Sequence, residues 1–149
     1  MLEELLGVDK INFTQEKMTW QEAIALTAKP LKEQGYIEER YIENMIKKVD
    51  EFGPFIYLGE GIALPHARPE EGVIKMGLAL LRCQETINLV DDEEYPVKMF
   101  ICLAASDNNS HLDVLAELGS LLTNKEKLTA LLDAKNAQEI LEVFKKPAP

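Results

Sequence analysis

Two positions near the middle of the chain have the residue types for phosphoryl-group chemistry. His66 follows the apolar run 62–64 and Pro65, and Arg68 lies two residues further on. Proline fixes its own φ and biases the residue before it toward an extended conformation, so we expect the imidazole just past a strand end on stiff backbone. A nucleophilic imidazole beside a guanidinium suits the handling of a phosphoryl group. Position alone equally allows an ordinary loop histidine.

The second histidine lies at the start of a predicted helix. Ser110 and Asp113 resemble a capping pair, which puts His111 in the first turn of a helix over residues 111–122. The positive end of the helix dipole disfavours protonation of this imidazole and favours a nearby anion. A neutral His111 can therefore donate one hydrogen bond to a phosphate. Its sequence context alone also fits a surface histidine in a capping region.

Phosphorylation of a histidine requires an unprotonated ring nitrogen as nucleophile, together with stabilisation of the three phosphoryl oxygens. Helix N-termini and hydrogen-bond donors can supply that stabilisation without a metal. The sequence has no glycine-rich loop followed by Lys and Ser or Thr, which argues against a nucleoside triphosphate kinase. It also lacks a Gly-x-Ser-x-Gly turn for a serine nucleophile.

Longer stretches around His66 resemble a known family. Residues 61–66, Gly-Ile-Ala-Leu-Pro-His, resemble the phosphorylation-site signature of the IIA components in the mannitol/fructose class (PTS EIIA type 2) of the bacterial sugar phosphotransferase system. The stretches 19–23, 39–42, 52–55 and 65–73 occur in the order and spacing typical of the L-ascorbate-specific branch. The resemblance covers most of the chain, roughly from residue 19 to residue 122.

The resemblance implies roles for three residues. His66 would be the phosphate acceptor, and His111 would lie beside it. Family members use Nε2, but the sequence itself does not indicate which ring nitrogen of His66 is used. An arginine in the helix before the signature points at the phosphorylated histidine in the family, and that role falls to Arg40 here. Sequence alone favours a solvated surface arginine at this position, because a cation near a helix N-terminus is mildly unfavourable.

The resemblance also implies partners. Phosphorylated HPr would donate to His66, which would pass the group to a cysteine of the cognate IIB protein, and the membrane component IIC would then move the sugar. We expect that sugar to be L-ascorbate, with galactitol, mannitol and fructose as alternatives. A rival interpretation is a regulatory IIA-like protein whose phosphorylation state is read by a partner. No cofactor or metal is implied, and the oligomeric state is left open.

Strand and helix signals alternate along the chain. Helices are expected over 19–35, 38–49 and 111–122, then from 123 to 132 and from 136 to 144, and strands over 11–13, 55–58, 62–64, 76–81 and 97–105. This order predicts an α/β layered sandwich with a mixed, mostly parallel sheet of about five strands and helices on both faces. We expect one domain over 1–149 with its core from about 11 to 145, preceded by a loose or weakly helical leader.

Composition narrows the possible partners and location. The formal net charge of −10 makes nucleic acid and anionic membrane surfaces poor partners. No run of about 18 apolar residues is present and the acidic N-terminus lacks a signal-peptide pattern, so we expect a cytoplasmic protein. Cys83 and Cys102 are expected to be buried free thiols. A zinc site joining them to the two histidines is not favoured, because the gaps match no close-paired zinc spacing.

Overall fold

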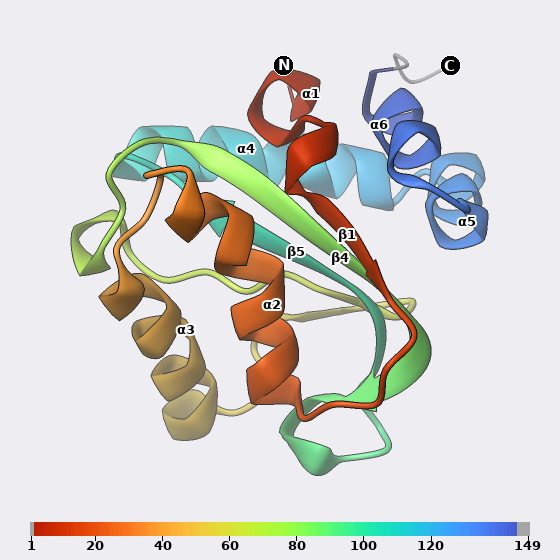
Figure 1. Ribbon diagram of the computed structural model, residues 1–149, viewed down its shortest axis with the longest axis horizontal. Helices are drawn as coiled ribbons and strands as arrows, with labels where there is room; N and C mark the ends of the chain where they lie inside the picture. The colour runs from red at the N-terminus through yellow and green to blue at the C-terminus, as the bar shows by residue number, and fades with distance from the viewer. Residues whose placement is uncertain (1, 146–149) are drawn as a thin grey trace.

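Within the described residues, 2–145, a five-stranded sheet forms the middle layer of this computed structural model, and helices cover both faces (Figure 1). The strands lie in the order β1 (Ile11–Thr14), β4 (Gly77–Asn88), β5 (Pro96–Ala104), β3 (Ile62–Ala63) and β2 (Tyr57–Gly59). The strand β5, with a nearly continuous apolar run, lies in the middle of this order.

The sheet is mixed, as the sequence predicts, but the expectation that it is mostly parallel is wrong. Among the described strands, β1 pairs with β4 and β3 with β5 in parallel, whereas β4 with β5 and β2 with β3 are antiparallel. The difference arises because β4 and β5 follow one another through a short turn over residues 89–95. A connection of that length can join only antiparallel neighbours, since parallel strands need a longer crossover.

Alternate side chains of β5 enter two separate cores. The core beneath α2 (Trp20–Glu33) and α3 (Glu39–Phe52) receives Phe100, Cys102 and Ala104. The core beneath α1 (Leu2–Leu6), α4 (Asn108–Leu122), α5 (Lys125–Asp133) and α6 (Ala137–Lys145) receives Met99, Ile101 and Leu103. Buried on both faces, β5 is a rigid support for whatever lies at its carboxyl end.

Two chain segments differ from the sequence-based expectation. The leader is not loose, because α1 buries Leu2 and Leu6 in the second core. The helix expected from residue 111 begins earlier, at Asn108, where the carboxylate of Asp107 accepts a hydrogen bond from the backbone N–H of Ser110 at 2.8 Å. His111 still lies in the first helical turn, and its own backbone N–H donates to the carbonyl oxygen of Asp107 at 3.0 Å.

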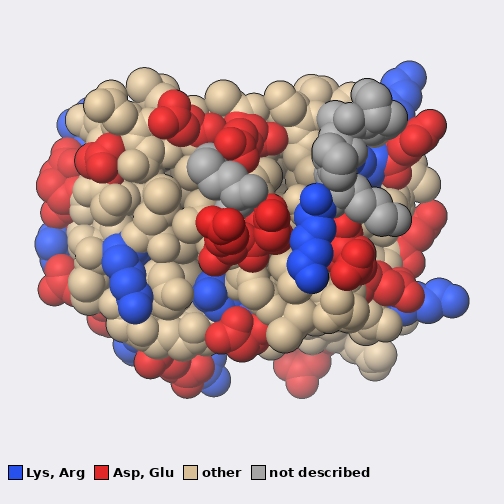
Figure 2. Space-filling view, turned by 90° about the horizontal axis from the view of Figure 1, so that it is seen from above, with Lys and Arg blue, Asp and Glu red and all other residues tan. Residues whose placement is uncertain are grey.

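The surface agrees with the acidic composition. Seen from above, over α1, α4, α5 and α6, acidic side chains outnumber basic ones (Figure 2). This face would repel anionic surfaces. Among the described residues no helix is long and apolar enough to cross a membrane.

Candidate functional site

The two histidines meet in a cavity of about 270 Å³ whose walls come from three parts of the chain. The last turns of α3 contribute Lys48 and Phe52, the segment between α3 and β4 contributes Phe55 and residues 66–68, and the first turn of α4 contributes His111. The ring centroids of His66 and His111 are 5.3 Å apart. The structure thus brings together two residues that are separated by 45 positions in the sequence.

The backbone that carries His66 is held on both sides as it leaves the sheet. The N–H of Leu64 donates to the carbonyl oxygen of Ile56 at 2.8 Å. On the opposite side, the N–H of Leu103, in β5, donates to the carbonyl oxygen of Pro65 at 3.0 Å. His66 therefore stands just past the end of β3 on fixed backbone, which is the position expected from the proline before it.

One hydrogen bond determines which ring nitrogen of His66 is free. Nδ1 lies 2.7 Å from the carbonyl oxygen of Leu64. A carbonyl can only accept, so Nδ1 must carry the proton, and in the neutral ring Nε2 then keeps its lone pair. Phe55 packs edge-on against the same imidazole, with 5.6 Å between the ring centroids, and limits the tilt of the ring.

Both imidazoles are held in the neutral form. Burial lowers the pKa of His66, and the Lys48 ammonium lowers it further, against the opposing effect of the hydrogen bond to Leu64. Burial also lowers the pKa of His111, and the nearby His66 adds to that effect. At neutral pH the cavity therefore holds an unprotonated nucleophilic nitrogen beside a second neutral imidazole.

His111 has hydrogen-bonding capacity to spare. Its Nδ1 is buried and has no hydrogen-bond partner within the part of the chain that the structure describes. A buried polar atom without a partner is unfavourable unless a ligand or another group comes to it. Because this ring lines the cavity, an anion bound there is a suitable partner for its N–H.

Lys48 is a cation of the cavity that sequence reasoning missed. Its ammonium lies 3.1 Å from a carboxylate oxygen of Glu71, and its side chain is 25% exposed. The same carboxylate accepts a hydrogen bond from the backbone N–H of Arg68 at 3.0 Å, so it links the loop after His66 to α3. The available signal was the position of Lys48 one helical turn before Phe52, where α3 ends beside the histidine segment.

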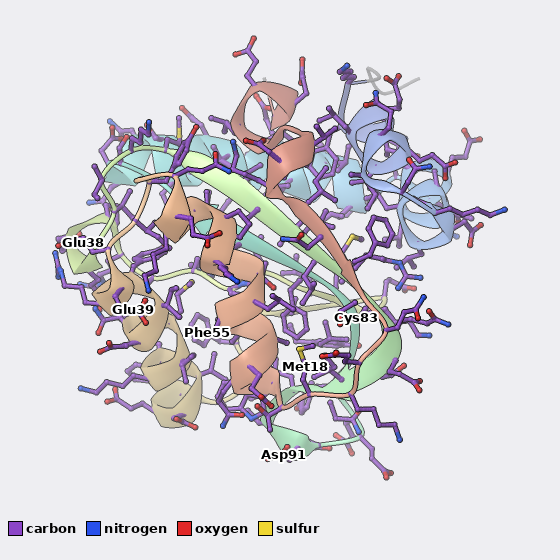
Figure 3. All side chains as sticks on the ribbon, viewed as in Figure 1. Met18, Glu38, Glu39, Phe55, Cys83 and Asp91 are labelled. Carbon is purple, nitrogen blue, oxygen red and sulfur yellow. The ribbon has the colours of Figure 1, made fainter. Side chains whose placement is uncertain are left out.

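Arg40, by contrast, is not among the residues that line the cavity. It lies in the first turn of α3, and its guanidinium Nε donates to the carboxylate of Glu38 at 3.1 Å. Glu38 lies at the beginning of the helix (Figure 3). Lys48 is two helical turns further on, about 12 Å along the axis at 1.5 Å per residue. The structure thus brings His66 and His111 together but not Arg40, whose role stays a prediction.

Two of the side chains that line the cavity are exposed and apolar. Phe52 is 69% exposed and Phe55 is 45% exposed, and Leu112, which follows His111 in the sequence, is 64% exposed. Exposed apolar groups that gather around a polar site are typical of surfaces that bind another protein. The sequence alone does not indicate that these side chains are exposed, because their exposure depends on where α3 ends and α4 begins.

Comparisons with known proteins agree with the fold. Residues 4–146 match the family described as "Phosphoenolpyruvate-dependent sugar phosphotransferase system, EIIA 2". The ascorbate-specific PTS system EIIA component of Escherichia coli K12 is 33% identical over 135 residues, which are 90% of this chain and 88% of that protein. The mannitol-specific cryptic phosphotransferase enzyme IIA component of the same organism is 32% identical over 143 residues, 96% of this chain and 97% of that protein.

One of the solved structures that resemble this chain is a complex of two proteins. The structure of enzyme IIAMTL with phosphorylated enzyme IIBMTL, from Escherichia coli, superposes with a TM-score of 0.79 at 29% identity, covering 93% of this chain and 97% of that one. The α/β fold of this chain is thus shared with phosphotransferase components. The chain belongs to the EIIA type 2 family of the phosphoenolpyruvate-dependent sugar phosphotransferase system.

The geometry predicts that Lys48 helps to keep His66 neutral. In Lys48→Met, the pKa of His66 should rise, because the ammonium is lost and the carboxylate of Glu71 is left without its cation. In the unchanged protein the ring should titrate below its ordinary value of about 6.5. An NMR titration of the His66 ring measures both values.

Lys47→Met is the matched control, since Lys47 pairs with Glu51 instead and does not line the cavity. The assignment of Lys48 would be contradicted by equal His66 titration curves in the two variants.

Proposed function

We propose that this chain accepts a phosphoryl group from phosphorylated HPr on Nε2 of His66 and passes it to a cysteine of a cognate IIB protein. The observation that carries the proposal is the hydrogen bond from Nδ1 of His66 to the carbonyl oxygen of Leu64. It leaves Nε2 as the nucleophile in a cavity that the ring itself lines. The resemblance of the sequence to family members that use Nε2 supports the same atom.

The transfer needs only groups that the cavity supplies. The Nε2 lone pair attacks phosphorus in line with the bond to the donor, the new N–P bond forms, and the donor atom leaves with its electron pair. His111 is suited to donate from Nδ1 to a phosphoryl oxygen, and Lys48 and Arg68 offer positive charge at the same wall. Groups fixed before the reaction stabilise developing charge without reorganising, which favours transfer.

The partner and the sugar rest on the relatives and on the apolar border of the cavity. The solved IIAMTL complex contains a phosphorylated IIB protein, and the ascorbate-specific component is among the relatives. The open cavity lined by the exposed Phe52 and Phe55 suits a protein that must dock, exchange one group and leave. We therefore propose an ascorbate-type IIB as acceptor, acting in the cytoplasm upstream of a membrane IIC component.

The acceptor is tested by intact mass. After incubation with phosphoenolpyruvate, Enzyme I and HPr, the wild-type protein should gain one phosphoryl group, whereas His66→Ala should gain none. The adduct should be acid-labile and stable in base, as expected for phosphohistidine. A mass gain in His66→Ala equal to that of wild type would rule out His66.

His111→Ala is the companion variant. It should still be phosphorylated on His66, because it keeps the nucleophile, but transfer should slow by about 10²–10³, the usual effect of losing one fixed donor to a transferring group.

The cation that faces the phosphate is tested by the lifetime of the phosphorylated protein. Lys48→Gln should shorten that lifetime, because the ammonium lines the cavity and the amide has no charge. Arg40→Lys serves as the comparison and should leave the lifetime unchanged if Arg40 keeps its contact with Glu38. The role that the resemblance gives Arg40 predicts the opposite, since lysine cannot copy the fork of donors of an arginine. Decay of phosphate from purified protein measures both.

The sugar branch is tested with three IIB proteins. Ascorbate-, galactitol- and mannitol-type IIB are offered at equal concentration to the phosphorylated protein. We expect the ascorbate type to accept phosphate at least about tenfold faster, equivalent to about 1.4 kcal/mol of transition-state discrimination. The preference should arise at residues 52–55 and 65–73, since the phosphoryl group is the same for every sugar.

Phe52→Ala should reduce this preference, whereas Phe13→Ala, which removes another exposed phenyl group far from the cavity on the edge strand β1, should not. Faster transfer to another IIB would overturn the ascorbate assignment and leave the family intact. Transfer to none of the three would favour the regulatory interpretation.

A further inference from the structure

A buried tyrosine hydroxyl stands between β5 and the segment that carries His66. Tyr41, in α3, is fully buried, and its hydroxyl lies 2.6 Å from the carbonyl oxygen of Leu103 and 3.0 Å from the backbone nitrogen of Ala67. The hydroxyl also lies 3.2 Å from the carbonyl oxygen of Ala67, but its one proton goes to the nearer oxygen of Leu103, and its lone pair accepts from the N–H of Ala67. Ala67 follows His66 directly, and this N–H belongs to the peptide unit that joins them.

The register of the sheet explains why this contact is unusual. Ile62 pairs with Met99 and Ala63 with Phe100, and the same parallel register places His66 opposite Leu103. In a parallel ladder the N–H of Leu103 donates to the residue before His66, and its carbonyl accepts from the residue after it. The first of these bonds is present, from Leu103 to Pro65 at 3.0 Å. In place of the second, the hydroxyl of Tyr41 is inserted between Ala67 and Leu103.

The ladder is also interrupted one step earlier. Pro65 has no N–H, so it cannot make the bond that would follow Ala63. The chain therefore separates from β5 between Pro65 and Ala67, where the imidazole of His66 must face the cavity. The proline allows this separation, and the tyrosine hydroxyl fixes its width. The Nδ1 bond to Leu64 then sets the rotation of the ring on that fixed backbone.

We propose that the Tyr41 hydroxyl is a positioning group for phosphoryl transfer. It holds the His66–Ala67 peptide away from β5, so that Nε2 lies at the right depth in the cavity. The proposal rests on the proposed function of His66 and adds a residue that does not touch the phosphoryl group. Other contacts tie this loop to α3, among them Asn44 to the carbonyl of Glu71 at 3.0 Å, but those bonds lie four or more residues past His66.

Tyr41→Phe removes a single oxygen atom. We expect the N–H of Ala67 to move toward Leu103 and bond directly at about 2.9 Å, in place of the two bonds that now pass through the hydroxyl. This shift draws His66 toward β5. Because a displacement of about 1 Å in a reacting group can reduce a rate by about 10², the maximal rate of phosphorylation should fall at least tenfold.

The assay uses phosphoramidate, a small donor that needs no protein partner. Nε2 attacks phosphorus, the P–N bond of the donor breaks, and ammonia leaves with the electron pair and a proton. In Tyr41→Phe the maximal rate should fall while the half-saturating donor concentration stays within about twofold, since Lys48 and His111, which face the donor from α3 and α4, keep their places. In parallel, ring ¹⁵N shifts should show His66 leaving the pure Nδ1–H tautomer for a mixture, a readout that involves no phosphoryl transfer.

Two variants separate positioning from a loss of stability. Asn44→Ala breaks another tie between α3 and the loop, and Tyr57→Phe removes a phenol oxygen for which the structure shows no hydrogen bond to a described residue. Both should keep the wild-type rate and tautomer. Replacing Ala67 by lactic acid turns its amide into an ester and removes the N–H that the Tyr41 hydroxyl holds. No direct bond to Leu103 can then form, but the loop loses its tie to the hydroxyl, so the maximal rate should fall here too. This ester variant also serves if Tyr41→Phe does not fold.

Four results bear on the proposal. A maximal rate and tautomer in Tyr41→Phe within about twofold of wild type would overturn it, as would an equal loss in Asn44→Ala. A lower maximal rate in Tyr41→Phe and in the ester variant, with wild-type rates in Asn44→Ala and Tyr57→Phe, supports it. If wild-type His66 takes no phosphate from any donor, the proposed function fails, and the tautomer measurement still decides whether Tyr41 orients the ring.

Discussion

The structure around the cavity depends on how the chain leaves the sheet between residues 64 and 67. A strand that continued along β5 would bury the imidazole of His66 or turn it with the pleat of the sheet. Instead, the hydrogen bonds of Leu64 to Ile56, just before β2, and of Pro65 to Leu103, in β5, end the ladder in a fixed place. Every later requirement, including the tautomer, the neutral ring and the meeting with His111, follows from that fixed exit.

The neutral state of His66 is a result of packing as much as of charge. Burial is the main cause of its lowered pKa, and the aromatic edge of Phe55 supplies part of that burial. The cation Lys48 acts in the same direction on the ring, yet it also offers positive charge for an arriving phosphate. One lysine can thus favour both the neutral ring of His66 before the transfer and the phosphorylated ring after it. Each of these two states carries less positive charge than the protonated ring.

The sequence predicted the architecture and the position of His66 past a strand end because both leave local signals. Periodicity and capping residues indicated most helices and strands, and the proline before His66 indicated a strand end. Features set by distant contacts were not predicted. The hairpin-like pairing of β4 with β5, the cap of α4 at Asp107 and the burial of α1 each depend on which surfaces meet. Lys48 was missed for the same reason, since its position one turn before Phe52 gains meaning only once the end of α3 is seen to face His66.

The pairing of Lys48 with Glu71 suits a group that must arrive and leave with little net change in free energy. A lone buried ammonium would bind a phosphate tightly, because nothing else would neutralise it in a poorly solvated site. Here the carboxylate already satisfies the ammonium at 3.1 Å, so an incoming phosphate gains only the difference between two anionic partners. When the phosphate departs, the original pair can form again without leaving a buried charge alone. A carrier that holds its cargo for one exchange needs such a balance, whereas a storage site would favour the unpaired cation.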